Sequence, residues 1–328
     1  MPDFLTLAVS NLTSPMVLFF CLGLAAAFAR SDLVIPEAVA KTLAIYLMMA
    51  IGFKGGVEVS RSGLAGDIVA LIGAGVLLAT ALPAVGYVLL RSTSRLSVAN
   101  AAAVAAHYGS ISVVTFVAAS QVLLAAGLGF DGALIAVAAV MEMPAIVVAL
   151  LIARRFSAPA ERPASGSGFW REAALNSSIV MLLGSFVIGW VSGEPGLEAI
   201  APLIVDPFSG ILTLFLLDMG LIAGRGLGRS WRELKPPVVL FGLYMPLVSA
   251  AAASAAAMAL GLAVGSAALL ITLAASASYI AVPAAMRLAL PEAQPSIYLT
   301  LSLGVTFPFN LTVGIPLYIA IAGRIAGP

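Results

Sequence analysis

The chain has 328 residues, of which 62% are hydrophobic and 9% are charged, and its mean hydropathy is +1.11. A soluble domain carries about 25% charged residues, so this chain has too few charges to cover a surface in water. Its net charge of +1 without a basic cluster also excludes a nucleic-acid-binding protein. The composition excludes a cytosolic enzyme and a disordered protein, and it predicts a protein that crosses a membrane several times.

Ten apolar segments separated by polar residues are the candidate membrane spans. We expect all ten to be helices, because a backbone in lipid is satisfied only in a helix or a closed barrel. Runs such as Ala250–Ala259 lack the alternation of a barrel strand. The predicted fold class is therefore an all-α polytopic membrane protein with ten transmembrane helices. In chain order, the predicted spans are residues 14–29, 36–52, 66–90, 97–125, 132–153, 173–192, 203–224, 236–259, 266–289 and 296–322.

Basic residues are distributed unevenly over the two predicted sides of the membrane. If the N-terminus lies outside, only Lys54, Arg61 and Arg324 are on the outer side, and Lys41 falls within a span. Basic residues accumulate on the cytoplasmic side of membrane proteins, so both termini are predicted to be extracytoplasmic. The basic residues of the predicted inner side are Arg30, Arg91, Arg95, Arg154, Arg155, Arg162, Arg171, Arg225, Arg229, Arg232, Lys235 and Arg287.

The longest predicted connection, residues 156–172, lies between the fifth and sixth spans. It is rich in Pro, Gly and Ser, which is typical of a linker. We expect it to be a cytoplasmic linker between two repeats of five helices each, residues 1–155 and 173–328. Because five is an odd number, the second repeat is predicted to be inverted relative to the first.

Three sequence features recur in the two halves in the same order. Glycines end span 2 and recur in span 7, small polar residues interrupt spans 4 and 9, and the mid-span Pro144 of span 5 recurs as Pro308 of span 10. The offsets are 164–169 residues. Inverted repeats with interrupted helices in corresponding positions are typical of secondary transporters. The pattern therefore indicates transport.

Span 4 contains the segment His107-Tyr-Gly-Ser-Ile-Ser-Val-Val-Thr-Phe116. Gly109 permits a break, and a half-helix starting near Ser110 directs free N–H groups and a positive dipole end toward the midplane, which suits a small anion. Pro283 predicts the mirror-related break in span 9. The alternative is that these small residues only pack between membrane helices. The candidate substrate-binding residues are Gly109, Ser110, Ile111, Ser112, Thr115, Ser276 and Ser278.

Only Glu142 and Asp218 among the acidic residues lie well inside apolar spans, where an ionised group costs roughly 2.5–3.5 kcal/mol. For Glu142 we expect a cation ligand or proton carrier, the alternative being a structural hydrogen bond. For Asp218 we expect packing or an ion pair with Arg225. Pro308 frees a backbone carbonyl beside side-chain oxygens of the kind that bind alkali cations, although Asn310 is equally compatible with joining two helices. The candidate ligands of an alkali cation are Glu142, Ser112, Thr306, Asn310 and Thr312, and no other cofactor is expected.

His107 and Ser110 lie three residues apart on one helix face, a spacing compatible with an intramembrane serine hydrolase. No acid is placed to orient the imidazole, and a serine within a helix lacks an oxyanion hole. We therefore expect His107 to be a packed or substrate-lining residue, and we expect that the protein is not an enzyme.

Several motifs occur together and in order over nearly the whole length of the chain. These are Leu12-Thr-Ser-Pro-Met-Val-Leu-Phe-Phe20, Ser31-Asp-Leu-Val-Ile-Pro-Glu37, Ala50-Ile-Gly-Phe-Lys-Gly-Gly56, His107-Tyr-Gly-Ser-Ile-Ser-Val-Val-Thr-Phe116, Met141-Glu-Met-Pro144, Phe215-Leu-Leu-Asp-Met-Gly220 and Gly304-Val-Thr-Phe-Pro-Phe-Asn310. In this set of motifs, the chain resembles the sodium-dependent bicarbonate transporter family (SbtA-type permeases).

The resemblance implies a ten-helix protein of the bacterial inner membrane with inverted five-helix repeats, assembled as a homotrimer. It also implies bicarbonate uptake by Na⁺ symport with alternating access, and a PII-like regulator that binds from the cytoplasm, as in cyanobacterial members. One Na⁺ per bicarbonate cancels the cost of moving an anion into a negative interior, about 2.3 kcal/mol per charge per 100 mV. The alternative is a Na⁺-coupled carrier of another small organic or inorganic anion.

Overall fold

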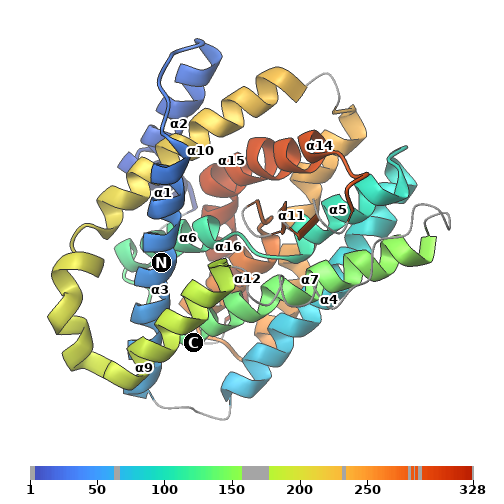
Figure 1. Cartoon of the computed structure of the whole chain (residues 1–328). Helices are drawn as coiled ribbons and strands as arrows, with labels where there is room; N and C mark the ends of the chain where they lie inside the picture. The colour runs from blue at the N-terminus through green and yellow to red at the C-terminus, as the bar shows by residue number, and fades with distance from the viewer. Residues whose placement is uncertain are drawn as a thin grey trace.

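The computed structural model of the chain describes residues 4–62, 67–156, 177–230, 234–279, 282–283, 285–286 and 290–326. Within these ranges all regular structure is helical, which confirms the predicted class (Figure 1). The elements are α1 (Phe4–Leu12), α2 (Pro15–Phe28), α3 (Glu37–Ser62), α4 (Asp67–Thr93), α5 (Val98–Gly109), α6 (Val113–Ala125), α7 (Ala133–Phe156), α9 (Ser177–Ile204), α10 (Phe208–Ser230), α11 (Pro236–Ala259), α12 (Val264–Ala275), α14 (Pro295–Leu301), the π-helical η2 (Ser302–Thr306), α15 (Phe307–Phe309), the π-helical η3 (Asn310–Gly314) and α16 (Ile315–Ile325).

The described residues contain seven helical stretches that are long and apolar enough to cross a membrane. The helices α2 and α12 are apolar but shorter. The multi-pass membrane character is thus confirmed, whereas the count of ten spans stays a prediction. The stretches are Glu37–Arg61, Ile68–Thr93, Val98–Ala125, Ala133–Phe156, Phe208–Gly228, Pro236–Ala259 and Pro295–Ile325.

Several boundaries differ from those predicted. The helix α3 continues to Ser62, ten residues past the predicted end of the second span at residue 52. Residues 193–202 were expected to connect spans 6 and 7, but α9 continues through them to Ile204 after a kink. Gly193 adopts φ 57° at this kink, a conformation that glycine tolerates, and Pro195 suits the first turn of the helix that follows. A further helix, α1, precedes the first predicted span, and Asn11 Nδ2 of α1 donates to Leu311 O at 2.5 Å. The predicted linker 156–172 lies outside the described residues except for Phe156.

Glycines bring four helices into two very close pairs, α2 with α10 and α3 with α9. A Cβ on Gly23 would overlap a backbone oxygen of α10, and a Cβ on Gly220 would overlap one of α2. Gly56 of α3 and Gly189 of α9 face each other's backbone in the same reciprocal way. Small residues at such positions allow membrane helices to approach closely. Figure 1 shows these four helices at the left, with α4, α5, α7 and α11 to their right.

Candidate substrate and ion site

The fourth predicted span is interrupted, as expected. The helix α5 ends at Gly109, and α6 begins at Val113 after a non-helical segment in which Ser110 has φ −88° and ψ 176°. Gly109 lies against Pro83 of α4 and Ala145 of α7, and a Cβ on Gly109 would overlap the proline ring. The glycine is therefore required by close packing, and the break is held in place between α4 and α7.

The ninth predicted span is also interrupted at its serines. The helix α12 ends at Ala275, and Ser276 is extended, with φ −85° and ψ 166°. Of the half-helix predicted to follow, only residues 282–283 and 285–286 lie within the described part of the chain, and these are helical. The Oγ of Ser278 accepts a long hydrogen bond of 3.5 Å from Val282 N.

The two interruptions are joined directly to each other by hydrogen bonds. Ser112 N donates to Ser276 Oγ at 2.8 Å, and Ser278 N donates to His107 O at 2.8 Å. Ser276 Oγ in turn donates to Leu273 O at 2.7 Å. Segments more than 160 residues apart in the sequence therefore cross at one buried point, which we call the serine crossing and define as residues 110–112 and 276–278.

Two hydroxyl groups at the serine crossing have distinct roles. Ser112 Oγ caps α6, accepting from Thr115 N at 3.2 Å and from Thr115 Oγ1 at 2.9 Å. Ser110 Oγ is buried and has no hydrogen-bond partner among the described residues. Ile111, between them, is 1% exposed and packs in the core. Because a buried hydroxyl without a partner is costly, Ser110 stays a candidate for contact with a ligand.

The tenth predicted span contacts both interruptions. Thr306 Oγ1 is hydrogen bonded to the hydroxyl of Tyr108, just before Gly109, and donates to Gly242 O at 2.7 Å. Asn310 Nδ2 donates to Ala275 O, the last residue of α12, at 2.9 Å. Thr306 is thus bonded to the Tyr108 side chain near the end of α5, and Asn310 to the last residue of α12.

The span stays helical around Pro308, but its turns are widened on both sides. Phe307 N donates to Ser302 O and Ile315 N donates to Asn310 O, both with π-helical spacing. Such π-helical turns occur frequently at functional sites. Thr312 Oγ1 donates to Pro308 O of the same helix at 2.7 Å and is only partly buried, so no hydrogen bond joins it to the other candidates.

Glu142 of α7 is 2% exposed, and its Oε2 has no hydrogen-bond partner in the described part of the chain. It lies three residues before Ala145, which touches Gly109, so the carboxylate is on the side of α7 that faces the end of α5. No three His, Cys, Asp or Glu residues gather among the described residues. The described residues therefore form no cluster of His, Cys, Asp and Glu of the kind that holds a transition metal.

Three aromatic side chains lie near the candidate site. One of them, His107, was considered from the sequence, and two tyrosines were not predicted. His107 is packed: its ring stacks on Tyr298 at a centroid distance of 4.5 Å, and its Nδ1 lies 2.6 Å from Ala103 O. The tyrosines Tyr108 and Tyr318 hold Thr306 and Asn310, the latter through a 2.7 Å bond from the tyrosine hydroxyl to Oδ1. The adjacency of Tyr108 to the predicted break was the only sequence signal for this role.

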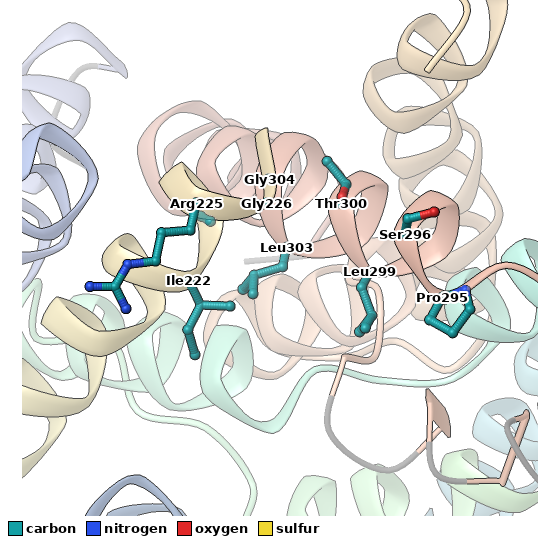
Figure 2. Close-up of a pocket in the computed structure, with 10 residues that line it drawn as sticks. Ile222, Arg225, Gly226, Pro295, Ser296, Leu299, Thr300, Leu303 and Gly304 are labelled. Atoms are coloured by element: carbon teal, nitrogen blue, oxygen red, sulfur yellow. The ribbon is translucent and has the colours of Figure 1, made fainter. Parts of the chain in front are cut away.

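Asp218 of α10 is 4% exposed, and its Oδ2 has no hydrogen-bond partner among the described residues. The guanidinium of Arg225 donates instead to Leu33 O at 2.6 Å, so the close ion pair considered from the sequence is not formed. Arg225 lines a cavity of about 350 Å³ between α10 and the α14–η2 segment. Figure 2 shows Ile222 of α10 and Leu303 of η2 pointing toward each other in this cavity.

Two further cavities of about 270 and 590 Å³ lie elsewhere on the molecule. The smaller is lined by residues of α3 and α6, and the larger by residues of the α4–α5 connection and the start of α11. Ser110 and Ser276 do not line any of these three cavities, and each is only 1% exposed. The serine crossing is therefore buried in this conformation.

These features define a multi-pass helical membrane protein in which two interrupted segments meet at a buried polar point. The family model of the Na⁺-dependent bicarbonate transporter superfamily matches residues 15–323, nearly the whole chain. The chain belongs to this superfamily, which confirms the resemblance found in its motifs. No curated protein matches the chain in a sequence search.

Proposed function

We propose that the protein is a Na⁺-coupled symporter that takes up bicarbonate by alternating access, and that it is not an enzyme. The observation that supports this most directly is the serine crossing, where two breaks are hydrogen bonded to each other and the buried hydroxyl of Ser110 has no partner within the described parts of the chain. Bicarbonate has three oxygens that accept hydrogen bonds, and the crossing is rich in hydroxyl and N–H donors. In this proposal the substrate contacts Gly109, Ser110, Ile111, Ser112, Thr115, Ser276 and Ser278.

Na⁺ is proposed to bind next to the anion. Glu142, whose Oε2 is unpartnered among the described residues, supplies the one negative charge, and Ser112, Thr306 and Asn310 supply neutral oxygens. Thr312 completes the proposed set with the least support, because its hydroxyl is bonded within its own helix. An adjacent cation and anion offset each other's desolvation, so occupancy of one site favours occupancy of the other.

The close helix pairs support an inverted repeat. Gly23 and Gly189 are 166 residues apart, Gly56 and Gly220 are 164 apart, and exchanging the two halves converts the α2–α10 pair into the α9–α3 pair. We propose that these four helices form a fixed scaffold. The remaining helices around the serine crossing would then move against it to expose the site to each side in turn.

Assembly, orientation and regulation complete the proposal. Exposed apolar side chains such as Val69, Leu77 and Val191 on α4 and α9 are available for lipid or for neighbouring subunits of a homotrimer. The excess of basic residues in the predicted inner loops supports extracytoplasmic termini in a bacterial inner membrane. A PII-like regulator would bind on the cytoplasmic side.

The decisive experiment is uptake of isotope-labelled bicarbonate into proteoliposomes that contain the purified protein. Uptake driven by an inward Na⁺ gradient, with little uptake when K⁺ or choline replaces Na⁺, is the expected result. Equal uptake with K⁺ or choline would refute the coupling.

Competition by formate, nitrate, acetate and larger carboxylates tests the alternative substrate class, because a site built from serine and glycine should reject bulky anions. Stronger inhibition by a larger carboxylate than by unlabelled bicarbonate would overturn the assignment of substrate.

A further inference from the structure

The cavity of about 270 Å³ lies between two parts of the molecule that the proposed function assigns to different units. One wall comes from α3 and the first residue of α10, and the other from α6, the connection that follows it and α7. Both polar and apolar residues line it. The lining residues used in this argument are Lys54, Glu58, Phe116, Ser120, Gln121 and Phe208.

Lys54 is the cationic group of this cavity. Its Nζ lies 4.3 Å from the centroid of the Phe208 ring, a cation–π contact that holds the ammonium in place. No carboxylate oxygen of a described residue lies within 4 Å of this Nζ. Glu58, one turn further along α3, is paired instead with Arg61 at 3.3 Å. The positive charge of Lys54 is therefore not neutralised by a close ion pair in the described structure.

The remaining walls provide further polar groups. Ser120 Oγ donates to Val117 O at 2.8 Å and keeps its acceptor capacity, and Gln121 Oε1 accepts from Ser209 Oγ at 3.4 Å, which orients the amide. A partly buried ammonium with a nearby amide is a favourable environment for a small oxyanion, because hydrogen bonds to charged groups are the strong ones. The volume suits an anion of a few heavy atoms with its water, not a large organic acid.

The cavity also reaches toward the serine crossing. Phe116 lines the cavity and lies four residues after Ser112 on α6, which is about 6 Å along the helix axis. The corresponding position in the other half carries the opposite charge: Lys54 lies two residues before Gly56, and Asp218 lies two residues before Gly220. The position that corresponds to Lys54 in the other half thus carries an acidic side chain instead of a cation.

We propose that this cavity is a second anion site, in which Lys54 captures a small oxyanion before it reaches the serine crossing. The inference rests on the proposed function for the direction of movement and for the identity of the anion as bicarbonate. The crossing uses neutral donors, so it cannot attract an anion from a distance, whereas an unneutralised ammonium can. Lys54 then affects the KM for the anion, and not the rate at which the loaded protein changes conformation.

The test measures bicarbonate uptake at saturating Na⁺ in proteoliposomes. Lys54→Gln should raise the KM for bicarbonate roughly tenfold or more, the effect of losing one hydrogen bond to a charged group, while the maximal rate stays within about twofold. Lys54→Arg should keep a KM close to that of the unmodified protein. Lys41→Gln is the matched control, because Lys41 is an exposed lysine on the same helix, paired with Glu37. An unchanged KM in Lys54→Gln would overturn the proposal.

Two further measurements separate this proposal from the proposed function. Isothermal calorimetry with choline bicarbonate and choline formate, without Na⁺, reports the cavity alone, because the crossing is expected to need Na⁺. Lys54→Gln should weaken this binding at least about tenfold, and equal binding by both proteins overturns the inference. If the unmodified protein fails to transport bicarbonate but shows Lys54-dependent formate binding, the proposed transport function is wrong and the proposed anion site in the cavity is supported.

A second variant is needed if Lys54→Gln does not fold. Ser120→Leu fills the cavity and keeps Lys54, so it should raise the KM for bicarbonate. An unchanged KM in Ser120→Leu refutes the site.

Discussion

Ser112 and Ser276 are joined by a 2.8 Å hydrogen bond from the backbone N–H of the first to the side-chain oxygen of the second. Their positions are 164 residues apart, one in each half of the chain. A reciprocal bond joins Ser278 N to His107 O. Neither half can form this arrangement alone, so the proposed anion site exists only when the two halves are packed together.

Removal of the Ser276 hydroxyl should damage both the site and the fold. Ser276→Ala leaves the buried N–H of Ser112 without its acceptor, which costs about 1–3 kcal/mol. We expect a lower thermal midpoint in detergent and a KM for bicarbonate raised by about tenfold. Ser254→Ala is the control, because that hydroxyl only donates to Ala250 O of its own helix. A Ser276→Ala protein with normal stability and KM would show that the hydrogen bond between Ser112 and Ser276 contributes neither to folding nor to bicarbonate binding.

Glu142→Gln should affect Na⁺ more than bicarbonate. The substitution keeps the shape of the side chain but removes the one negative charge of the proposed cation site. The Na⁺ concentration for half-maximal uptake is expected to rise at least about tenfold, with the bicarbonate KM at saturating Na⁺ nearly unchanged. Glu37→Gln, at an exposed position of α3, is the control. A Na⁺ response identical to that of the unmodified protein would remove Glu142 from the site.

Asn310 and Thr312, two residues apart in the sequence, should behave differently. Asn310→Ala loses the bonds to Ala275 O and Tyr318 OH, so we expect weaker Na⁺ activation and a lower thermal midpoint. Thr312→Val loses only a bond within its own helix, so its effect on both measurements should be small. If instead Thr312→Val impaired Na⁺ activation as strongly as Asn310→Ala, the site would extend toward Thr312.

The close helix pairs should tolerate no added methyl group. Gly189→Ala places a Cβ against the backbone of Phe53, and overpacking of this kind costs about 1–3 kcal/mol or more. We expect a clear loss of thermal stability in detergent and less folded protein in the membrane. Gly184→Ala on the same helix is the matched control, because nothing lies within 4 Å of the added atom. Equal stability of the two variants would contradict the packing of α3 on α9.

Much of the fold and part of the site were accessible from local sequence features. Low charge and long apolar runs identified a helical membrane protein, since a lipid-embedded backbone has few alternatives. Gly109 and the serines after it located the break in span 4, and Ser276 located the one in span 9. The kink at Gly193 was missed because a glycine followed by Pro195 also fits a loop.

Tertiary structure alone decided which of these features meet. Hydropathy and the preferences of Gly, Pro and Ser act on the few residues around them, so they predict where a helix ends but not what it touches. The bonds Ser112–Ser276 and Tyr108–Thr306, and the cavity that joins Lys54 to Phe116, depend on how helices distant in the sequence pack. Packing also distinguished Asn310, which bonds to the end of α12, from Thr312, which bonds to its own helix, although both carry similar oxygens.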